Sequence, residues 1–209
     1  MEIAAASLSP ADAYKLMIGI VVPRPIAWVT SLNAAGLVNA APFSAYTFCG
    51  KNPPMVCFNV GRREAAFKDT AANIRANGEF VVNSVTVEAV EPMHETSAEY
   101  PSHLSEVEAL GLELLPSKAV KPPRIALSPV HLECKLERIV QLGRDRDELI
   151  IGEVVYFHVR DDLIKDGKVS TEALNPLARL GGPRYATLGR YITMAFTSGF
   201  GEQNQKRAS

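Results

Sequence analysis

Two long apolar segments in the C-terminal half constrain the fold of this chain most strongly. Their composition predicts β-strands over residues 130–142 and 148–159, joined by a turn over residues 143–147. A long hydrophobic antiparallel pair with an open edge promotes aggregation, so we expect both strands to belong to a curved, closed sheet. The regular strand–helix alternation of a doubly wound fold is missing, which favours a mainly β class with peripheral helices.

Shorter elements are expected before this hairpin. Ser9 is a candidate N-cap for an N-terminal helix, with Pro10 at its first position and Gly19 at its end. A turn over residues 33–36 separates the first strand from the segment that carries Asn39. Further strands are expected over residues 26–32, 55–60 and 79–87.

The composition fits one globular domain over residues 1–209, with a core over about residues 20–195. The 209 residues are 47% hydrophobic and 22% charged, which is enough for a full core. A formal net charge of −1 gives no broad basic surface for nucleic acid. No basic region precedes an apolar run at the N-terminus, and the best apolar run ends at Pro23, so we expect neither a signal peptide nor a membrane span. We therefore expect a cytoplasmic protein that acts on small molecules.

Cysteine and histidine spacing predicts no metal site. The cysteines are Cys49, Cys57 and Cys134. Because they lack a CxxC pattern and a nearby histidine group, we expect reduced core thiols. His131 and His158 fall in predicted strands, where a structural role is the commoner one. His94 and His103 lie in a polar, proline-bounded segment and are better candidates for substrate contact.

Basic side chains near a predicted helix start are candidates for phosphate binding. No G-x-G-x-x-G follows a strand and no Walker-type loop is present, which argues against a Rossmann or P-loop nucleotide site. A helix that Asp69 or Thr70 caps and Gly78 ends is expected, and its N-terminus would attract an anion. Three cations precede it: Arg62, Arg63 and Lys68. A solvated basic surface is the alternative interpretation.

Neutral hydrogen-bonding side chains are concentrated on a predicted hairpin over residues 24–46. Thr30 and Ser31 lie near the end of its first strand, where their hydroxyl groups can donate to phosphate or hydroxyl oxygens of a ligand. Asn39 and Ser44 follow on the second segment and can serve a ligand edge of alternating donors and acceptors. Taken singly, each of these residues is more typical of a turn or a cap.

In their order and spacing, segments of this chain resemble the flavin reductase-like family. These segments are RPIAWVTSL, NAAPFSAY, NPPMVCFNV, KDTAANI, GEFVVNSV, HETSAEYP, LECKL, IIGEVVYFHV and LARLGGPRYATL, between residues 24 and 191. The resemblance implies a split β-barrel of Greek-key topology, with six antiparallel strands and flanking helices. It also implies a homodimer that binds FMN in a groove at the subunit interface.

The resemblance further implies which residues contact FMN. It matches Thr30 and Ser31 to the end of the first barrel strand. A second set lies beside the isoalloxazine ring: Asn39, Ala41, Pro42, Phe43, Ser44, Ala45 and Tyr46. A third set forms the phosphate-side loop and helix start: Asn59, Arg62, Lys68, Asp69 and Thr70. A fourth set lies in the C-terminal tail: Arg179, Gly181 and Tyr185. For this tail, an ordinary Gly-Pro loop before a final strand is the alternative.

One departure from the family pattern bears on the activity. Short NAD(P)H:flavin oxidoreductases of this family carry a Gly-Asp-His before a long strand, and its histidine is associated with the nicotinamide. The corresponding residues 143–148 contain no histidine. This difference moves the expectation toward the longer flavoredoxin-like branch, whose members include electron carriers.

Three functions follow as expectations. The first is an FMN-dependent oxidoreductase that takes hydride from NADH or NADPH and reduces flavin or another acceptor. The alternative is a non-enzymatic flavoredoxin-type electron carrier that serves an electron-accepting partner protein. A split barrel that binds another ligand, such as haem, is the third. Because a bound flavin carries the difficult chemistry itself, no catalytic residue is assigned.

Overall fold

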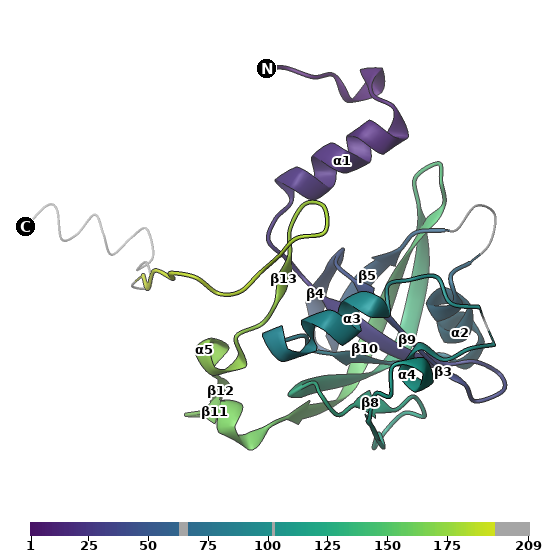
Figure 1. Ribbon diagram of the computed structural model, residues 1–209, viewed down its shortest axis with the longest axis vertical. Helices are drawn as coiled ribbons and strands as arrows, with labels where there is room; N and C mark the ends of the chain where they lie inside the picture. Colours follow the sequence, from purple (N-terminus) through teal and green to yellow (C-terminus); the bar gives the residue numbers. More distant parts are fainter. Residues whose placement is uncertain (63–66, 102, 195–209) are drawn as a thin grey trace, which may run out of the picture.

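One antiparallel sheet of seven strands forms the body of the structure (Figure 1). The computed structural model describes residues 1–62, 67–101 and 103–194. Across the sheet the strands are ordered β3-β2-β6-β9-β10-β5-β4. Their bounds are Ala27–Leu32 (β2), Val38–Phe43 (β3), Tyr46–Lys51 (β4), Pro54–Val60 (β5), Glu79–Asn83 (β6), Val130–Leu142 (β9) and Asp147–Val159 (β10).

The predicted long hairpin forms the centre of this sheet. β9 and β10 contain 13 residues each, and their pairing begins at Leu142 and Asp147 beside the turn. Register shifts interrupt the ladder after Ile151 and after Val154. Because such irregularities bend a strand and increase its twist, they help the sheet to curve.

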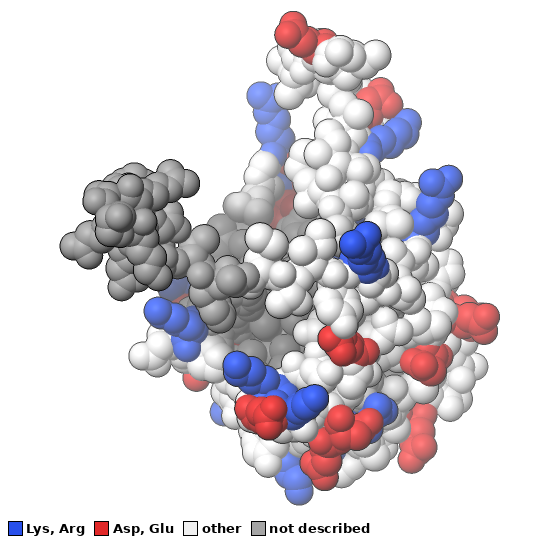
Figure 2. Space-filling view, turned by 90° about the vertical axis from the view of Figure 1, so that its left-hand side faces the viewer, with Lys and Arg blue, Asp and Glu red and all other residues white. Residues whose placement is uncertain are grey.

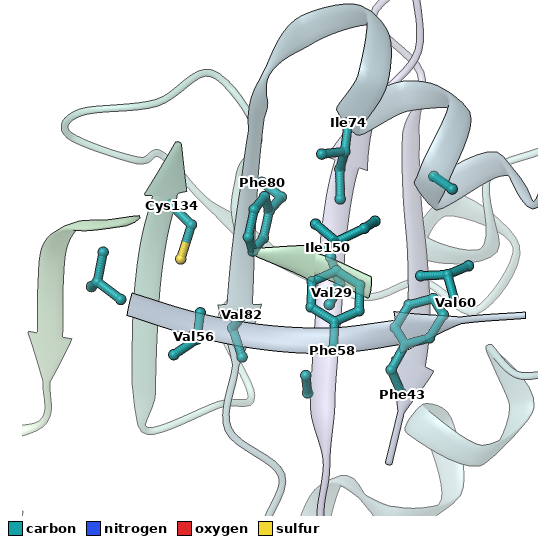
Figure 3. Packing of buried hydrophobic residues seen from close by; sticks show 13 residues of the cluster. Val29, Phe43, Val56, Phe58, Val60, Ile74, Phe80, Val82, Cys134 and Ile150 are labelled. Atoms are coloured by element: carbon teal, nitrogen blue, oxygen red, sulfur yellow. The ribbon is translucent and has the colours of Figure 1, made fainter. Parts of the chain in front are cut away.

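Aromatic packing joins two strands that are not neighbours in the sheet. The ring centroids of Phe43 in β3 and Phe58 in β5 lie 5.0 Å apart, and Phe80 of β6 packs edge-on against Phe58 at 5.5 Å. Figure 3 shows these rings within one apolar cluster. The sheet therefore curls around its core. Its edge strands β3 and β4 are not paired with each other in the described part of the chain, so hydrogen bonds do not close it.

The fold confirms the mainly β prediction and corrects two of its details. The main sheet has seven strands, where the resemblance implied a barrel of six, because β4 adds an edge strand that the sequence patterns did not predict. The sheet is curved but not closed. The edge strand β4 is largely exposed, and Cys49 within it is an exposed thiol rather than the core thiol we expected.

A second apolar core lies on the other face of β2. Val29 faces the first core, whereas Trp28 faces the second, so β2 is buried on both sides. The Trp28 indole N–H donates to Thr96 Oγ1 at 3.0 Å, which satisfies its polar atom inside the protein. Met93 and Ile125 cover this second core. These residues anchor the described parts of the segment between β6 and β9 against β2.

Helices and short strand pairs surround the sheet (Figure 1). The helices are α1 (Pro10–Ile20), α2 (Asp69–Asn77), α3 (Val90–Glu95), α4 (Glu106–Ala109) and α5 (Thr171–Leu174), with 3-10 turns at Ala5–Ser7, Val87–Ala89 and Asp161–Leu163. The short strands are β1 (Arg24–Pro25), β7 (Leu114–Leu115), β8 (Arg124–Ile125), β11 (Ile164–Lys165), β12 (Lys168–Val169), β13 (Ala178–Arg179) and β14 (Tyr185–Ala186). Among the described residues, no helix has the length and apolar character needed to cross a membrane.

Helix ends follow some of the predicted local signals, but Gly19 does not end α1, which continues to Ile20 with Val21 as its C-cap. Ser9 caps α1 by accepting from the backbone N–H of Asp12, as predicted. Gly78 ends α2 in the left-handed conformation, with φ of 70°. The N-cap of α2 is Lys68, however, so neither Asp69 nor Thr70 has the capping role that we expected.

Candidate functional site

A groove runs around the C-terminal end of β3. Three cavities share Pro42 in their walls, and we call them together the β3 groove. The largest has a volume of about 500 Å³, which lies in the range of pockets that hold small molecules. Its wall is formed by α1, the end of β3, β5 and the start of α2, through Tyr14, Met17, Ile18, Val21, Arg24, Phe43, Ser44, Ala45, Asn59, Gly61, Lys68 and Asp147.

Asn59 contributes a hydrogen-bond acceptor to this largest cavity. Its backbone N–H donates to the carbonyl of Ala45 at 2.9 Å, and its Nδ2 donates to Asp147 Oδ2 at 3.3 Å. Its Oδ1 is buried and has no hydrogen-bond partner among the described groups. Because an unpaired buried polar atom costs about 1–3 kcal/mol, a donor from a bound molecule would stabilise the folded protein here.

The N-terminus of α2 supplies positive potential to the groove. Lys68 is its N-cap and lines two of the three cavities. In the described part of the chain, the N-cap Lys68 makes no capping hydrogen bond with its side chain, so the first backbone N–H groups of this helix can bind an anion. Asp69, at the first helical position, opposes part of this potential. An anion near Lys68 would therefore lie on the side of the helix end away from Asp69.

The second cavity, of about 130 Å³, lies between α2 and the segment after α3. Asn39 Nδ2 donates to Thr70 Oγ1 at 2.9 Å, which ties β3 to α2. Glu106 is buried in the same wall, where its Oε2 accepts from the backbone N–H of Ala40 at 3.1 Å. Burial raises the pKa of the Glu106 carboxyl, and the neighbouring charge of Asp69 raises it further.

The third cavity, of about 170 Å³, brings the C-terminal tail to the groove. The hydroxyl of Tyr185 lies 2.8 Å from Nδ1 of His94, and Arg179 donates to the same hydroxyl. The Arg179 guanidinium also lies 4.7 Å above the Tyr185 ring. The structure thus places the predicted tail residues Arg179 and Tyr185 beside Ser44 in one wall, and it joins His94 to them.

Arg24 fixes α1 and the tail beside the groove, and sequence reasoning missed it. Its Nη1 donates to the carbonyls of Ile18 at 2.8 Å and Val21 at 2.7 Å. Its Nη2 donates to Leu180 at 3.2 Å, and its Nε donates to Ser44 at 3.3 Å. These contacts bridge segments 156 residues apart, so no local sequence pattern signals them. Glu106 was missed for the same reason.

Several predicted contact residues lie outside the β3 groove. Thr30 and Ser31 are fully buried, and their hydroxyls are bonded to Pro123 and Asn73 respectively. The other predicted residues outside the groove are Tyr46, which lines a separate cavity; Gly181, which packs against Gly19; and Arg62, which stacks on Phe67. Burial raises the pKa of the Tyr46 phenol. Arg63 lies outside the described residues.

The remaining predicted residues are brought together. They line one or more of the three cavities: Asn39, Ala41, Pro42, Phe43, Ser44, Ala45, Asn59, Lys68, Asp69, Thr70, Arg179 and Tyr185. The groove combines apolar walls, an uncapped helix N-terminus, and polar groups on opposite sides. Such a surface suits an elongated ligand with a flat ring at one end and an anionic group at the other.

The sequence and the fold both match known proteins. Residues 19–177 match the family model of the flavin reductase like domain. Component B of nitrilotriacetate monooxygenase from Bacillus cereus is 36% identical, with a TM-score of 0.90 over 93% of this chain and 98% of that one. The 2-nitrobenzoate 2-nitroreductase NbaA of Pseudomonas fluorescens is also 36% identical, with a TM-score of 0.87 over 95% and 97% of the two chains.

A more distant structure identifies the architecture. A split-barrel protein from Shewanella frigidimarina is 23% identical and has a TM-score of 0.83 over 94% of this chain and 100% of that one. At this identity the likeness concerns the fold alone. The predicted split-barrel architecture is therefore confirmed.

We predict that Glu106→Gln makes protein stability less dependent on pH. Because the folded-state pKa of Glu106 is raised, the folded protein binds more protons than the unfolded chain above about pH 4.5, and stability falls as pH rises through the folded pKa. The wild type should therefore lose stability relative to the variant from about pH 4.5 toward neutrality. Urea unfolding over this interval measures the difference, with Glu2→Gln at the exposed N-terminus as control. Equal slopes for all three proteins would contradict the prediction.

Proposed function

Because the chain belongs to the flavin reductase-like domain family, we propose that it is an oxidoreductase that binds FMN in the β3 groove. The observation that carries this proposal is the unpartnered Asn59 Oδ1 in a groove of about 500 Å³ that also holds Lys68 at a helix N-terminus. The first group offers an acceptor to a ribityl hydroxyl, and the second offers charge to a phosphate. This combination fits FMN, which carries both groups on one chain.

The phosphate of FMN would lie near the start of α2. The Lys68 ammonium and the free N–H groups of the first helical turn favour a dianion. Thr70 Oγ1 accepts a hydrogen bond from Asn39 Nδ2, which holds β3 against the helix end. Thr30 and Ser31 have no direct contact in this arrangement, because both side chains are fully buried outside the groove.

The isoalloxazine ring would lie along residues 41–45. Pro42 and Phe43 form an apolar wall there, and Ser44 supplies a hydroxyl held by Arg24. Bound FMN supplies the hydride or electron transfer. The chain's own residues bind and orient the ring, and the apolar side chains of α1 exclude water from one side of it. No described side chain has to act as a nucleophile in this scheme.

We further propose NADH or NADPH as the electron donor. The 36% identity to a monooxygenase component and to a nitroreductase favours an enzyme that passes electrons onward. The loop at residues 143–146 lacks a histidine, so the nicotinamide would need other contacts. Tyr185 in the wall of the third cavity, with His94 hydrogen-bonded to it, is the candidate. The same missing histidine favours the second candidate function, a flavoredoxin-type electron carrier that serves a partner protein.

We predict that the protein binds FMN and that Lys68→Ala weakens this binding by roughly 1.5 to 3 kcal/mol, the range for a hydrogen bond to a charged group. This change corresponds to about 10-fold to 150-fold in the dissociation constant. Titration of flavin fluorescence measures it. Lys165→Ala, on exposed β11, is the matched control and should leave the affinity unchanged. A protein that does not bind added FMN would contradict the proposed function.

Anaerobic mixing with NADH or NADPH separates the two candidate functions. An NAD(P)H-dependent enzyme should bleach the absorbance of added FMN in many turnovers, because reduced flavin or its electrons leave the site. An electron carrier should hold its FMN and show little or no reduction by either nucleotide, while dithionite still reduces it. FMN that binds tightly but resists both nucleotides would exclude the reductase assignment.

We also propose that the protein is a homodimer, in which a second copy covers α1 and the β3 groove. α1 projects away from the sheet (Figure 1) and has no buried residue. Its side chains Tyr14 and Ile20 are 65% and 73% exposed. Figure 2 shows that acidic and basic side chains are interspersed on the face in view, below this projecting segment. An exposed apolar helix beside a ligand groove suits an interface between copies.

Sedimentation at micromolar concentration should therefore give a dimer, since an obligate interface buries about 2,000 Å² or more in total. The double substitution Met17→Asp and Ile20→Asp should shift the protein to a monomer and lower its FMN affinity. Lys15→Ala on the same helix should do neither. A monomeric wild type would contradict the proposed dimer.

A further inference from the structure

A second cavity of comparable size lies away from the β3 groove. It has a volume of about 450 Å³ and shares no wall residue with the three cavities of the groove. Its walls come from the end of the β9–β10 hairpin remote from the turn, and from the segment around β8. In Figure 1, β8 lies at the opposite end of the molecule from α1. A ligand here would not touch the proposed FMN site.

His131 offers this cavity a neutral hydrogen-bond acceptor. The side chain lines the cavity and is only 4% exposed. Its Nε2 lies 2.9 Å from the carbonyl of Ile125, which only accepts, so Nε2 carries the proton. Burial lowers the pKa of His131 to about 4, and the ring is therefore neutral near pH 7. Nδ1 is then an acceptor, and among the described groups it has no partner.

Ser128 and Arg124 add a hydroxyl and a positive charge. Ser128 also lines the cavity, and its buried Oγ has no hydrogen-bond partner in the described structure. Arg124 donates from Nε and Nη2 to the carbonyl of Pro116, a neutral acceptor. No carboxylate of the described residues forms an ion pair with Arg124, and the buried Glu133 carboxylate near the cavity is paired with His158. A bound anion would be favoured beside Arg124.

Aromatic and apolar side chains form the rim of the cavity. Tyr156 and Leu127 are 43% and 41% exposed. The Tyr156 ring packs against His158 with 4.7 Å between ring centroids, which holds it in place. Apolar groups that surround a few polar ones are typical of sites for small organic ligands. The rim suits the flat face of an aromatic ring.

We propose that this cavity is a second ligand site, which binds a small aromatic carboxylate bearing a hydroxyl or amino group. The carboxylate pairs with Arg124, the ring packs against Tyr156 and Leu127, and the hydroxyl or amino group donates to His131 Nδ1. The carboxylate, the ring and the hydrogen-bond donor of the ligand each contact a different group of the cavity. The inference does not depend on the identity of the cofactor in the β3 groove.

Calorimetric titration of the full chain with three related compounds tests the proposal. 4-Hydroxybenzoate has all three features, whereas benzoate lacks the donor and phenol lacks the carboxylate. We expect 4-hydroxybenzoate to bind at least about 5-fold more tightly than either, the lower end for one satisfied buried polar group. Its affinity should be the same with and without FMN. Absence of binding, equal affinity for all three compounds, or competition with FMN would each overturn the proposal.

Substitution of Arg124 is the second test of the proposed site. Arg124→Gln should weaken 4-hydroxybenzoate binding about 10-fold or more, as expected for loss of a charge-assisted hydrogen bond, while phenol binding stays unchanged. Arg138→Gln, on the exposed part of β9, is the matched control and should behave as the wild type. Near-ultraviolet circular dichroism verifies that both variants are folded. If the Arg124→Gln protein is folded and keeps the wild-type affinity, Arg124 does not bind the carboxylate and the proposed site is overturned.

Discussion

The contact between Phe43 and Phe58 holds the sheet in its curled shape, and the β3 groove depends on it. These rings come from strands that are not neighbours in the sheet, and they pack directly against each other. Together with the hydrogen bond from the Asn59 N–H to the Ala45 carbonyl, this packing sets the end of β3 beside the end of β5, so that Ser44 and Asn59 reach the same cavity. Because aromatic pairs add about 0.5–1.5 kcal/mol beyond the burial of their area, this contact contributes to stability as well as to shape.

The polar side chains around the groove divide into positioning groups and groups that face a ligand. Ser31 accepts from Asn73 at 3.2 Å and Thr70 accepts from Asn39, so two hydroxyl–amide pairs fix α2 against β2 and β3. These pairs hold the helix start, and with it Lys68, at the edge of the cavity. Residues that resemble ligand contacts in the sequence can therefore serve the site without touching the ligand.

Local signals predicted the elements well, and long-range contacts explain what was missed. The cap at Ser9, the left-handed Gly78 and the long hairpin are set by a few neighbouring residues, so the sequence reveals them. β4 has mostly exposed side chains and pairs on one side only, so it lacks the apolar pattern of a buried strand. Most predicted groove residues do meet, but Arg24 and Glu106 act through partners far along the chain, which no local pattern encodes.

The same physical argument supports both proposed sites, because each contains buried polar atoms that lack a hydrogen-bond partner among the described residues. Among the described residues, these atoms include Asn59 Oδ1 at the β3 groove and Ser128 Oγ and His131 Nδ1 at the second cavity. Most buried polar groups in folded proteins are satisfied, so each exception needs an explanation. Glu148 Oε2 differs, because the other oxygen of that carboxylate is paired with Arg75. The three other atoms each belong to a residue that lines a cavity, where a bound molecule can supply the missing hydrogen bond.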